Sequence, residues 1–224
     1  MKTLAFDVYG TLINTSGVFA RLQQLVGDKA ESFTNLWRSK QLEYSFRRGL
    51  MQNYADFSVC TQQALNFCCD TLQVEISEAE MEKLLQSYRS LPAFEDVKVG
   101  LVKLQQPGLR LFAFSNGRSD DVRSLLVHAE IDHFFAGVVS CGEIMSFKPN
   151  PAVYAHFLRR ADCSGNEAWM ISSNPFDVIG AISAGMRAVW VKRSPQAVFD
   201  PWGIEPTLTI GSLADLAEGI ADNS

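Results

Sequence analysis

Four groups of polar residues stand at the ends of short apolar segments that lie far apart in the chain. They are Asp7, the pair Ser115 and Asn116, Lys148, and the segment 172–177 with a second carboxylate at Asp177. A carboxylate can act as a nucleophile, a lysine beside it can stabilise charge, and another carboxylate can accept a proton from water. These groups form one site only if the fold brings the ends of the segments together.

Six segments have the composition of buried β-strands: residues 4–9, 109–114, 137–140, 168–172, 188–192 and 207–210. Several are apolar almost throughout, as in strands that helices cover on both faces of a parallel sheet. Apolar residues recur at helical spacing between the later segments, as at Val122, Leu125, Leu126 and Ala129. This alternation from about residue 94 onward predicts a doubly wound α/β domain, a Rossmann-like parallel sheet. The carboxyl ends of parallel strands share one edge, so the four polar groups should converge there.

The first connection is far longer than a single crossover helix requires, because about a hundred residues separate the first two strands. Apolar positions at helical spacing run through it, including a stripe at 81–88 that follows the capping-box pattern Ser77-Glu78-Ala79-Glu80. Pro92 then breaks the chain. We therefore expect a helical cap domain at 14–92, inserted into an α/β core domain formed by 1–13 and 93–224.

Composition excludes several classes of protein. Hydrophobic residues make up 47% and charged residues 20%, which argues against disorder and coiled coil. The net charge of -5, with basic residues no denser than pairs, makes nucleic acid a poor partner. No apolar stretch approaches the ~18 residues that span a bilayer, so we expect no membrane association. The five cysteines have no C-x-x-C spacing, which predicts neither zinc site nor disulfide framework and favours the cytoplasm.

The polar groups and their neighbours resemble one known family. The matching segments are Phe6-Asp7-Val8-Tyr9-Gly10-Thr11-Leu12, Ser115-Asn116-Gly117, Lys148-Pro149 and Ser172-Ser173-Asn174-Pro175-Phe176-Asp177. In order and spacing they resemble the haloacid dehalogenase superfamily and, more narrowly, the L-2-haloacid dehalogenases. Trp37-Arg38-Ser39-Lys40-Gln41-Leu42-Glu43-Tyr44 is similar to that family's cap helix. The resemblance covers essentially the whole chain.

The resemblance implies an enzyme that hydrolyses short-chain (S)-2-haloacids to (R)-2-hydroxyacids and halide, without metal or other cofactor, as a homodimer. Asp7 would displace the halide and form an ester, which water then hydrolyses. Lys148 would hold the Asp7 carboxylate. Asp177 would accept a proton from that water, with Ser172 and Asn174 orienting it.

Further residues acquire roles by the same resemblance. Thr11 and Ser115, with backbone amides near Val8 and Tyr9, would bind Asp7 or the substrate carboxylate. Arg38, contributed by the cap, would receive the halide. Residues beside Arg38 or along the pocket would be Asn116, Phe176, Tyr9, Leu42, Phe57 and Tyr154, with Tyr154 also counted in the catalytic set.

Each feature also has a purely structural interpretation. Ser-Asn-Gly is a common turn, Asp177 could cap a helix, Arg38 could lie on an exposed face, and the aromatic residues could be core. Two departures from the family's usual residues, Phe176 for tryptophan and Ser39 for glutamine, leave the preferred leaving group and chain length open.

The main alternative is a magnesium-dependent phosphatase of the same superfamily acting on a small phosphorylated metabolite. Such enzymes usually carry a second aspartate where Tyr9 stands and further acid where Ser172 and Ser173 stand. Magnesium prefers several oxygen ligands with carboxylates among them. A catalytically silent binding protein is a third possibility, but it would require a broken motif, and none is found.

Overall fold

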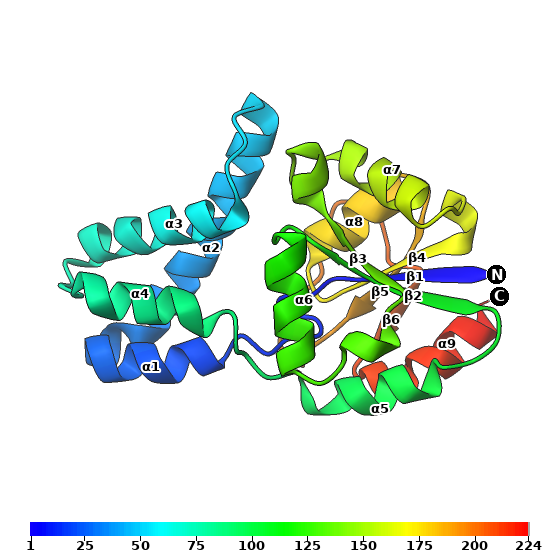
Figure 1. The fold of residues 1–224 in the computed structure, drawn as a ribbon, viewed down its shortest axis with the longest axis horizontal. Coiled ribbons are helices and arrows are strands. Elements are labelled where there is room, and N and C mark those ends of the chain that lie inside the picture. The colour runs from blue at the N-terminus through cyan, green and yellow to red at the C-terminus, as the bar shows by residue number, and fades with distance from the viewer. Residues whose placement is uncertain (224) are drawn as a thin grey trace.

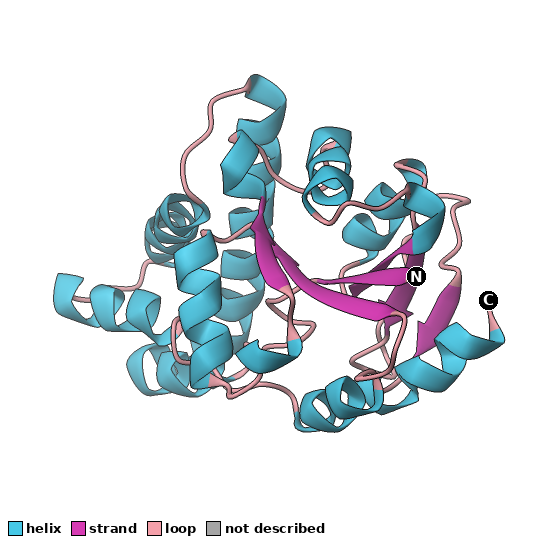
Figure 2. Cartoon of the chain, turned by 45° about the vertical axis from the view of Figure 1, so that its right-hand side comes forward, coloured by secondary structure: helices cyan, strands magenta, loops and turns pink. Residues whose placement is uncertain are grey.

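The computed structural model describes residues 1–223 and shows a parallel sheet of six strands in the order β3-β2-β1-β4-β5-β6. The strands are β1 (Lys2–Phe6), β2 (Leu109–Ser115), β3 (Gly137–Ser140), β4 (Ala168–Ser172), β5 (Arg187–Val191) and β6 (Leu208–Ile210). All neighbouring pairs are parallel, and helices lie on both sides of the twisted sheet (Figure 2). This order is that of the doubly wound Rossmann-like fold, which confirms the predicted fold class.

Alternate residues of each central strand enter two separate cores. Leu4 and Phe6 of β1 pack on one side, with helices α5 (Glu95–Lys103), α6 (Ser119–His128) and α9 (Leu216–Asp222). Ala5 packs on the other side, with helices α7 (Pro151–Arg160) and α8 (Pro175–Ser183). Because both faces are covered, the central strands are buried along most of their length, which is why they are visible in the sequence.

The first strand is shorter than the expected segment 4–9. It ends at Phe6, and the amides of Thr11, Leu12 and Ile13 all donate hydrogen bonds to the Val8 carbonyl. Gly10 has a φ of 82°, a left-handed conformation that favours glycine. Asp7 therefore comes directly after the strand. Its amide still donates to the Ile171 carbonyl of β4 (2.9 Å), and the turn begins at the next residue.

Helices α1 (Gly17–Val26), α2 (Ala30–Met51), α3 (Phe57–Leu72) and α4 (Glu78–Ser87) form a separate group beyond the carboxyl end of β1 (Figure 1). Buried Phe33 and Trp37 of α2 pack edge to face, and the Trp37 indole donates to the Thr61 carbonyl of α3 (2.8 Å). At the start of α4, Ser77 accepts from the Glu80 amide, but the Glu80 carboxylate pairs with Arg21 and Lys83. Only half of the predicted capping box therefore forms.

The two segments that connect this group to the sheet run side by side. The Asn14 amide donates to the Pro92 carbonyl (2.8 Å), and the Phe94 amide donates to the Leu12 carbonyl (3.0 Å). Across the described part of the chain, no helix is long and apolar enough to cross a membrane. The five cysteines are free thiols.

Candidate active site

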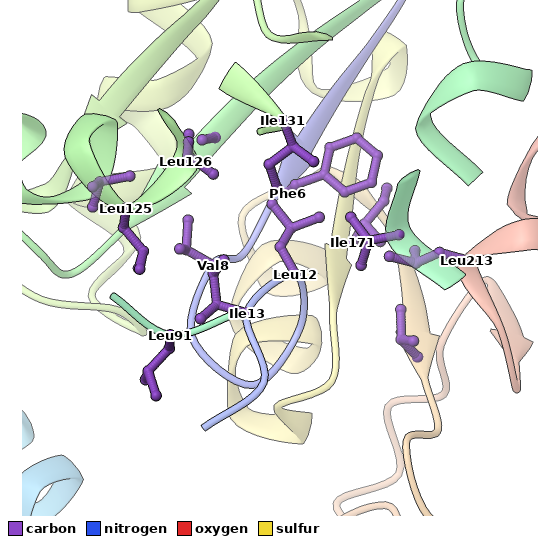
Figure 3. Close-up of a cluster of buried hydrophobic side chains, with 14 of the residues drawn as sticks. Phe6, Val8, Leu12, Ile13, Leu91, Leu125, Leu126, Ile131, Ile171 and Leu213 are labelled. Carbon is purple, nitrogen blue, oxygen red and sulfur yellow. The ribbon is translucent and has the colours of Figure 1, made fainter. Parts of the chain in front are cut away.

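The loop after β1 is anchored by apolar side chains. Val8, Leu12 and Ile13 are fully buried and point into the core with Phe6 and Ile171 (Figure 3). This packing holds Asp7 and Thr11 at the carboxyl edge of the sheet. It also shows that the Val8 side chain belongs to the core, so only the Val8 backbone could contact a substrate.

The Asp7 carboxylate accepts three hydrogen bonds from three elements of the fold. Thr11 Oγ1 and Asn174 Nδ2 donate to Oδ2 at 2.8 and 2.9 Å, and Lys148 Nζ donates to Oδ1 at 3.3 Å. Asp7 is nearly buried, with 8% of its surface exposed. A carboxylate that is held in one orientation and largely removed from water is poised to act as a nucleophile.

Lys148 lies between two carboxylates. Its ammonium donates to Asp177 Oδ2 and to the Phe114 carbonyl, both at 2.8 Å, as well as to Asp7. Burial works to lower the pKa of Lys148, but the charges of Asp177 and Asp7 outweigh it and raise that pKa, so the amine stays charged. Lys148 therefore partly neutralises two acids that would otherwise repel each other.

Tyr154 contacts the Asp177 carboxylate oxygen that does not face Lys148. Its hydroxyl donates to Asp177 Oδ1 at 2.9 Å, and both residues are fully buried. Burial and the Asp177 charge raise the pKa of Tyr154, so the phenol keeps the proton that it donates. A Cβ at Gly180 would lie 2.5 Å from this hydroxyl, so the close approach requires glycine. Tyr154 is predicted to line the pocket, and in the structure its ring is enclosed in the core and not on the wall of the cavity that Arg38 lines.

Asn174 joins the nucleophile to the helices of the α1–α4 group. It precedes α8, yet its side chain makes no capping hydrogen bond to that helix. Its Nδ2 donates to Asp7, and its Oδ1 accepts from Arg38 Nη2 of α2 at 3.3 Å. The predicted convergence of Asp7, Lys148, Asn174, Asp177 and Arg38 is thus present as a connected set of contacts.

Arg38 forms no ion pair with a carboxylate among residues 1–223. It lines a cavity of about 300 Å³ between the α1–α4 group and the carboxyl edge of the sheet. The other arginines of the cavity wall form ion pairs, Arg89 with Asp121 and Arg118 with Asp56. Among residues 1–223 the two hydrogen-bond partners of Arg38 are neutral amide oxygens. A cation so placed is suited to bind an anion.

Three polar residues from the sequence motifs shape the backbone of the site. Ser115 accepts a hydrogen bond from the Gly117 amide, and Ser172 accepts one from the Asn174 amide, both at 3.1 Å. Asn116 Oδ1 accepts from the Lys148 amide at 2.9 Å, which fixes the loop that carries the lysine. The side chains of Ser115 and Asn116 therefore hydrogen-bond to backbone amides of their own and the neighbouring loop, and not to Asp7 or Arg38.

The residues assigned to the pocket wall fall into two sets. Tyr9 and Phe57 line the cavity, and burial raises the pKa of Tyr9, which keeps its hydroxyl neutral. Phe176 packs edge to face on Phe46, with ring centroids 5.0 Å apart. Leu42 is half-buried on α2 and is not among the residues that line the cavity.

Several supporting residues had no predicted role. Gln41 Oε1 accepts from Arg38 Nη1 at 2.9 Å, and Gln41 Nε2 donates to Thr61 Oγ1 at 2.6 Å. Arg193 donates to the Thr11 carbonyl at 2.6 Å while pairing with Asp96. Gln41 stands three residues after Arg38 on one helix, a spacing that places side chains on the same face. Nothing comparable in the sequence indicates Thr61 or Arg193.

The acidic groups of the described residues do not gather around one point as metal ligands would. Within residues 1–223 no cluster of three or more histidine, cysteine, aspartate or glutamate side chains could hold a metal ion. The space between Asp7 and Asp177 is occupied by the Lys148 ammonium.

Comparison with known proteins defines the class first. The family model for haloacid dehalogenase-like hydrolases matches residues 1–185, and the chain belongs to that superfamily. The (S)-2-haloacid dehalogenase 2 of Pseudomonas sp. (strain CBS-3) is 32% identical over 96% of this chain and 94% of its own length. The haloacetate dehalogenase H-2 of Moraxella sp. (strain B) is 31% identical over 94% of this chain and 93% of its own.

A solved structure agrees with these relatives. The L-2-haloacid dehalogenase from Xanthobacter autotrophicus with chloropropionic acid covalently bound has a TM-score of 0.91 and 29% identity, and the match covers 99% of this chain and 98% of that one. Within the superfamily, the chain therefore belongs to the (S)-2-haloacid dehalogenase family.

Proposed function

We propose that this chain hydrolyses short-chain (S)-2-haloacids to (R)-2-hydroxyacids and halide through an ester on Asp7. The observation that carries the proposal is the arrangement of Asp7 and Arg38. A nearly buried carboxylate is fixed by Thr11, Asn174 and Lys148. One amide side chain away lies an arginine that has no carboxylate partner among residues 1–223.

The first step joins Asp7 to the substrate. One Asp7 carboxylate oxygen attacks C2 from the side opposite the halogen, the carbon–halogen bond breaks with both electrons going to the halide, and C2 is inverted. Arg38 receives the halide. An arginine already paired with a carboxylate would be a poorer acceptor of a second anion, which is why its neutral partners matter.

The second step returns the carboxylate. Water attacks the Asp7 carbonyl carbon and the bond from that carbon to the product oxygen breaks. That oxygen takes the second proton of the attacking water, and the 2-hydroxyacid leaves. Asp177 takes up the first proton of the water, with Asn174 and Ser172 in position to orient it. Burial is the main cause that raises the pKa of Asp177, and a more basic carboxylate accepts a proton more readily. Lys148 stabilises the charge that develops between the two acids.

The cavity favours a small substrate. Its volume of about 300 Å³ is at the lower end of the range for ligand pockets. Asp7 does not line this cavity itself and is connected to it through Asn174 and Arg38. Tyr9 and Phe57 supply apolar wall for a short carbon chain, while Arg38 supplies the charge. Because Phe176 has no N–H, the halide in this chain depends more on Arg38 than it would with an indole at that position.

Halide release from the two enantiomers of 2-chloropropionate, with and without EDTA, tests the proposal. We expect release from the S enantiomer at a rate that EDTA does not change, because Lys148 and not a metal ion neutralises Asp7. Phosphatase substrates serve as the comparison. Turnover of the haloacid that stops in EDTA and returns with magnesium, or hydrolysis of phosphate esters alone, would contradict the proposal.

The role of Arg38 is tested by Arg38→Lys. The variant keeps the charge but loses the planar fork that contacts Gln41 and Asn174, so halide release should slow at least ~10-fold, about 1.4 kcal/mol of transition-state stabilisation. Stopped-flow measurement of halide release checks this. Arg118→Lys is the matched control, because Arg118 lines the same cavity but is paired with Asp56. Equal effects of the two substitutions would mean that Arg38 has no special role.

Three further expectations complete the proposal. The α1–α4 group acts as a cap domain spanning 14–92 over the core of 1–13 and 93–224, with residues 13 and 93 side by side at its hinge. The enzyme works in the cytoplasm, in keeping with its free thiols. It assembles as a homodimer, which light scattering after gel filtration measures directly.

A further inference from the structure

Arg38 is held by a short chain of hydrogen bonds that begins on α3. Thr61 Oγ1 donates to the Phe57 carbonyl at 2.9 Å and accepts from Gln41 Nε2 at 2.6 Å. Gln41 Oε1 then accepts from Arg38 Nη1 at 2.9 Å, and Arg38 Nη2 donates to Asn174. These hydrogen bonds thus lead from α3 through Gln41 and Arg38 to Asn174, which contacts Asp7.

The direction of these bonds is fixed by chemistry. A hydroxyl has one proton, and Thr61 gives its proton to a carbonyl, so it must accept from Gln41. The amide nitrogen of Gln41 therefore faces Thr61, and the amide oxygen faces the guanidinium. Gln41 is only 1% exposed, so an alternative orientation would leave a buried donor facing the donors of Arg38.

The neutrality of Gln41 matters as much as its position. A glutamate in its place would give Arg38 a stronger partner, but it would also offset the guanidinium charge. Glutamine orients Arg38 and leaves the charge available to an incoming anion. The other two arginines of the cavity, which pair with Asp121 and Asp56, lack this arrangement.

We propose that Gln41, locked by Thr61, is a positioning residue that aims the Arg38 guanidinium while keeping its charge free for the leaving halide. The inference rests on the proposed function, in which Arg38 receives that halide. It adds a requirement at position 41 for a neutral hydrogen-bond acceptor. Neither a charged acceptor nor an apolar side chain of the same size can replace it.

Gln41→Glu separates this role from a structural one. The substitution keeps the shape and an acceptor for Arg38. It removes the donor that faces Thr61, but the Thr61 hydroxyl can turn its proton from the Phe57 carbonyl to the new carboxylate oxygen, so the variant should fold with a melting temperature close to that of wild type. Release of chloride from (S)-2-chloropropionate should nevertheless fall about 10-fold or more, because the new carboxylate offsets the guanidinium charge that stabilises the leaving halide. Bromide is a better leaving group and needs less help, so the loss with 2-bromopropionate should be smaller.

Gln62→Glu is the matched control. Gln62 is an exposed residue of α3 on the wall of the same cavity, and its substitution adds the same charge without a bond to Arg38. It should leave the bromide-to-chloride rate ratio at the wild-type value. An equal change of that ratio in both variants would reduce the effect to general repulsion of an anionic substrate and overturn the inference.

A double-mutant cycle tests whether Gln41 acts through Arg38. Gln41→Met removes the acceptor, and in the background of Arg38→Lys it should have little further effect, because coupled residues are not additive. Should Gln41→Met fold poorly, Thr61→Val removes the lock without touching Gln41, and it should change the leaving-group ratio in the same direction. Additive losses, or wild-type kinetics in Gln41→Glu, would contradict the proposal. Absence of halide release from the wild-type enzyme would instead refute the proposed function itself.

Discussion

Asp7→Asn is expected to abolish halide release, with a loss of at least ~10⁴-fold, as when other enzymes lose their nucleophile. The amide cannot attack C2, although its size still fits the contacts with Thr11, Asn174 and Lys148. Circular dichroism and the melting temperature show whether the variant is folded. Asp121→Asn is the control, since that acid pairs with Arg89 at the cavity wall and has no contact with the reacting groups.

Labelling with oxygen-18 water distinguishes covalent catalysis from a role for Asp7 as a general base. In one turnover in oxygen-18 water, with enzyme in excess, the product oxygen should come from Asp7 and be unlabelled, and the label should appear in the peptide that contains Asp7. Direct attack by water would label the product in the first turnover. Inversion at C2 occurs by either route, so the stereochemistry of the product does not distinguish them, whereas the position of the oxygen-18 label does. Label in the product and none in the peptide would refute the ester.

The sheet was predictable because both of its faces are covered. Short, mainly apolar runs are typical of such strands, and five of the six predicted segments coincide closely with β2 to β6. The first segment was extended to residue 9 because Val8 and Tyr9 continue the apolar run. Val8 is indeed buried, but it is buried by a turn and not by the strand. Composition alone does not distinguish these two forms of burial.

The site was predictable to the extent that it follows from strand ends. Asp7, Lys148, Asn174 and Asp177 meet because topology carries each of them to one edge. The residues that support Arg38 could not be predicted from the sequence, because the contact between Thr61 and Gln41 depends on how α3 packs on α2. Tyr154 illustrates the same limit: an aromatic residue with a hydroxyl suits a pocket wall or a buried network equally, and only packing placed it behind Asp177.

Lys148→Met is expected to destabilise the fold by about 3–5 kcal/mol, because it leaves two buried carboxylates without their shared cation. Activity should be lost as well. The free energy of unfolding, measured with urea at several pH values, gives a result that lost packing alone would not produce. In the variant, burial and the nearby Asp7 charge would raise the pKa of Asp177 further, so the folded state would bind a proton that the unfolded state has released. The deficit relative to wild type should therefore be smallest near pH 4 and grow as the pH rises through the raised value.

The double variant Lys148→Met with Asp177→Asn is the control for that argument. Removing one charge relieves the repulsion, so the double variant should recover much of the lost stability and its deficit should no longer grow with pH. At alkaline pH the deficit of the single variant should shrink again, because wild type then loses the stability that Lys148 contributes. Because the pKa of Lys148 is raised by its two acids, the stability that it contributes is complete below the ordinary lysine value of about 10.4 and is lost as the pH rises through the raised one. A single variant as stable as wild type at pH 7, or a deficit that is the same at pH 4 and pH 7, would mean that the lysine fills space and does not hold the two acids together.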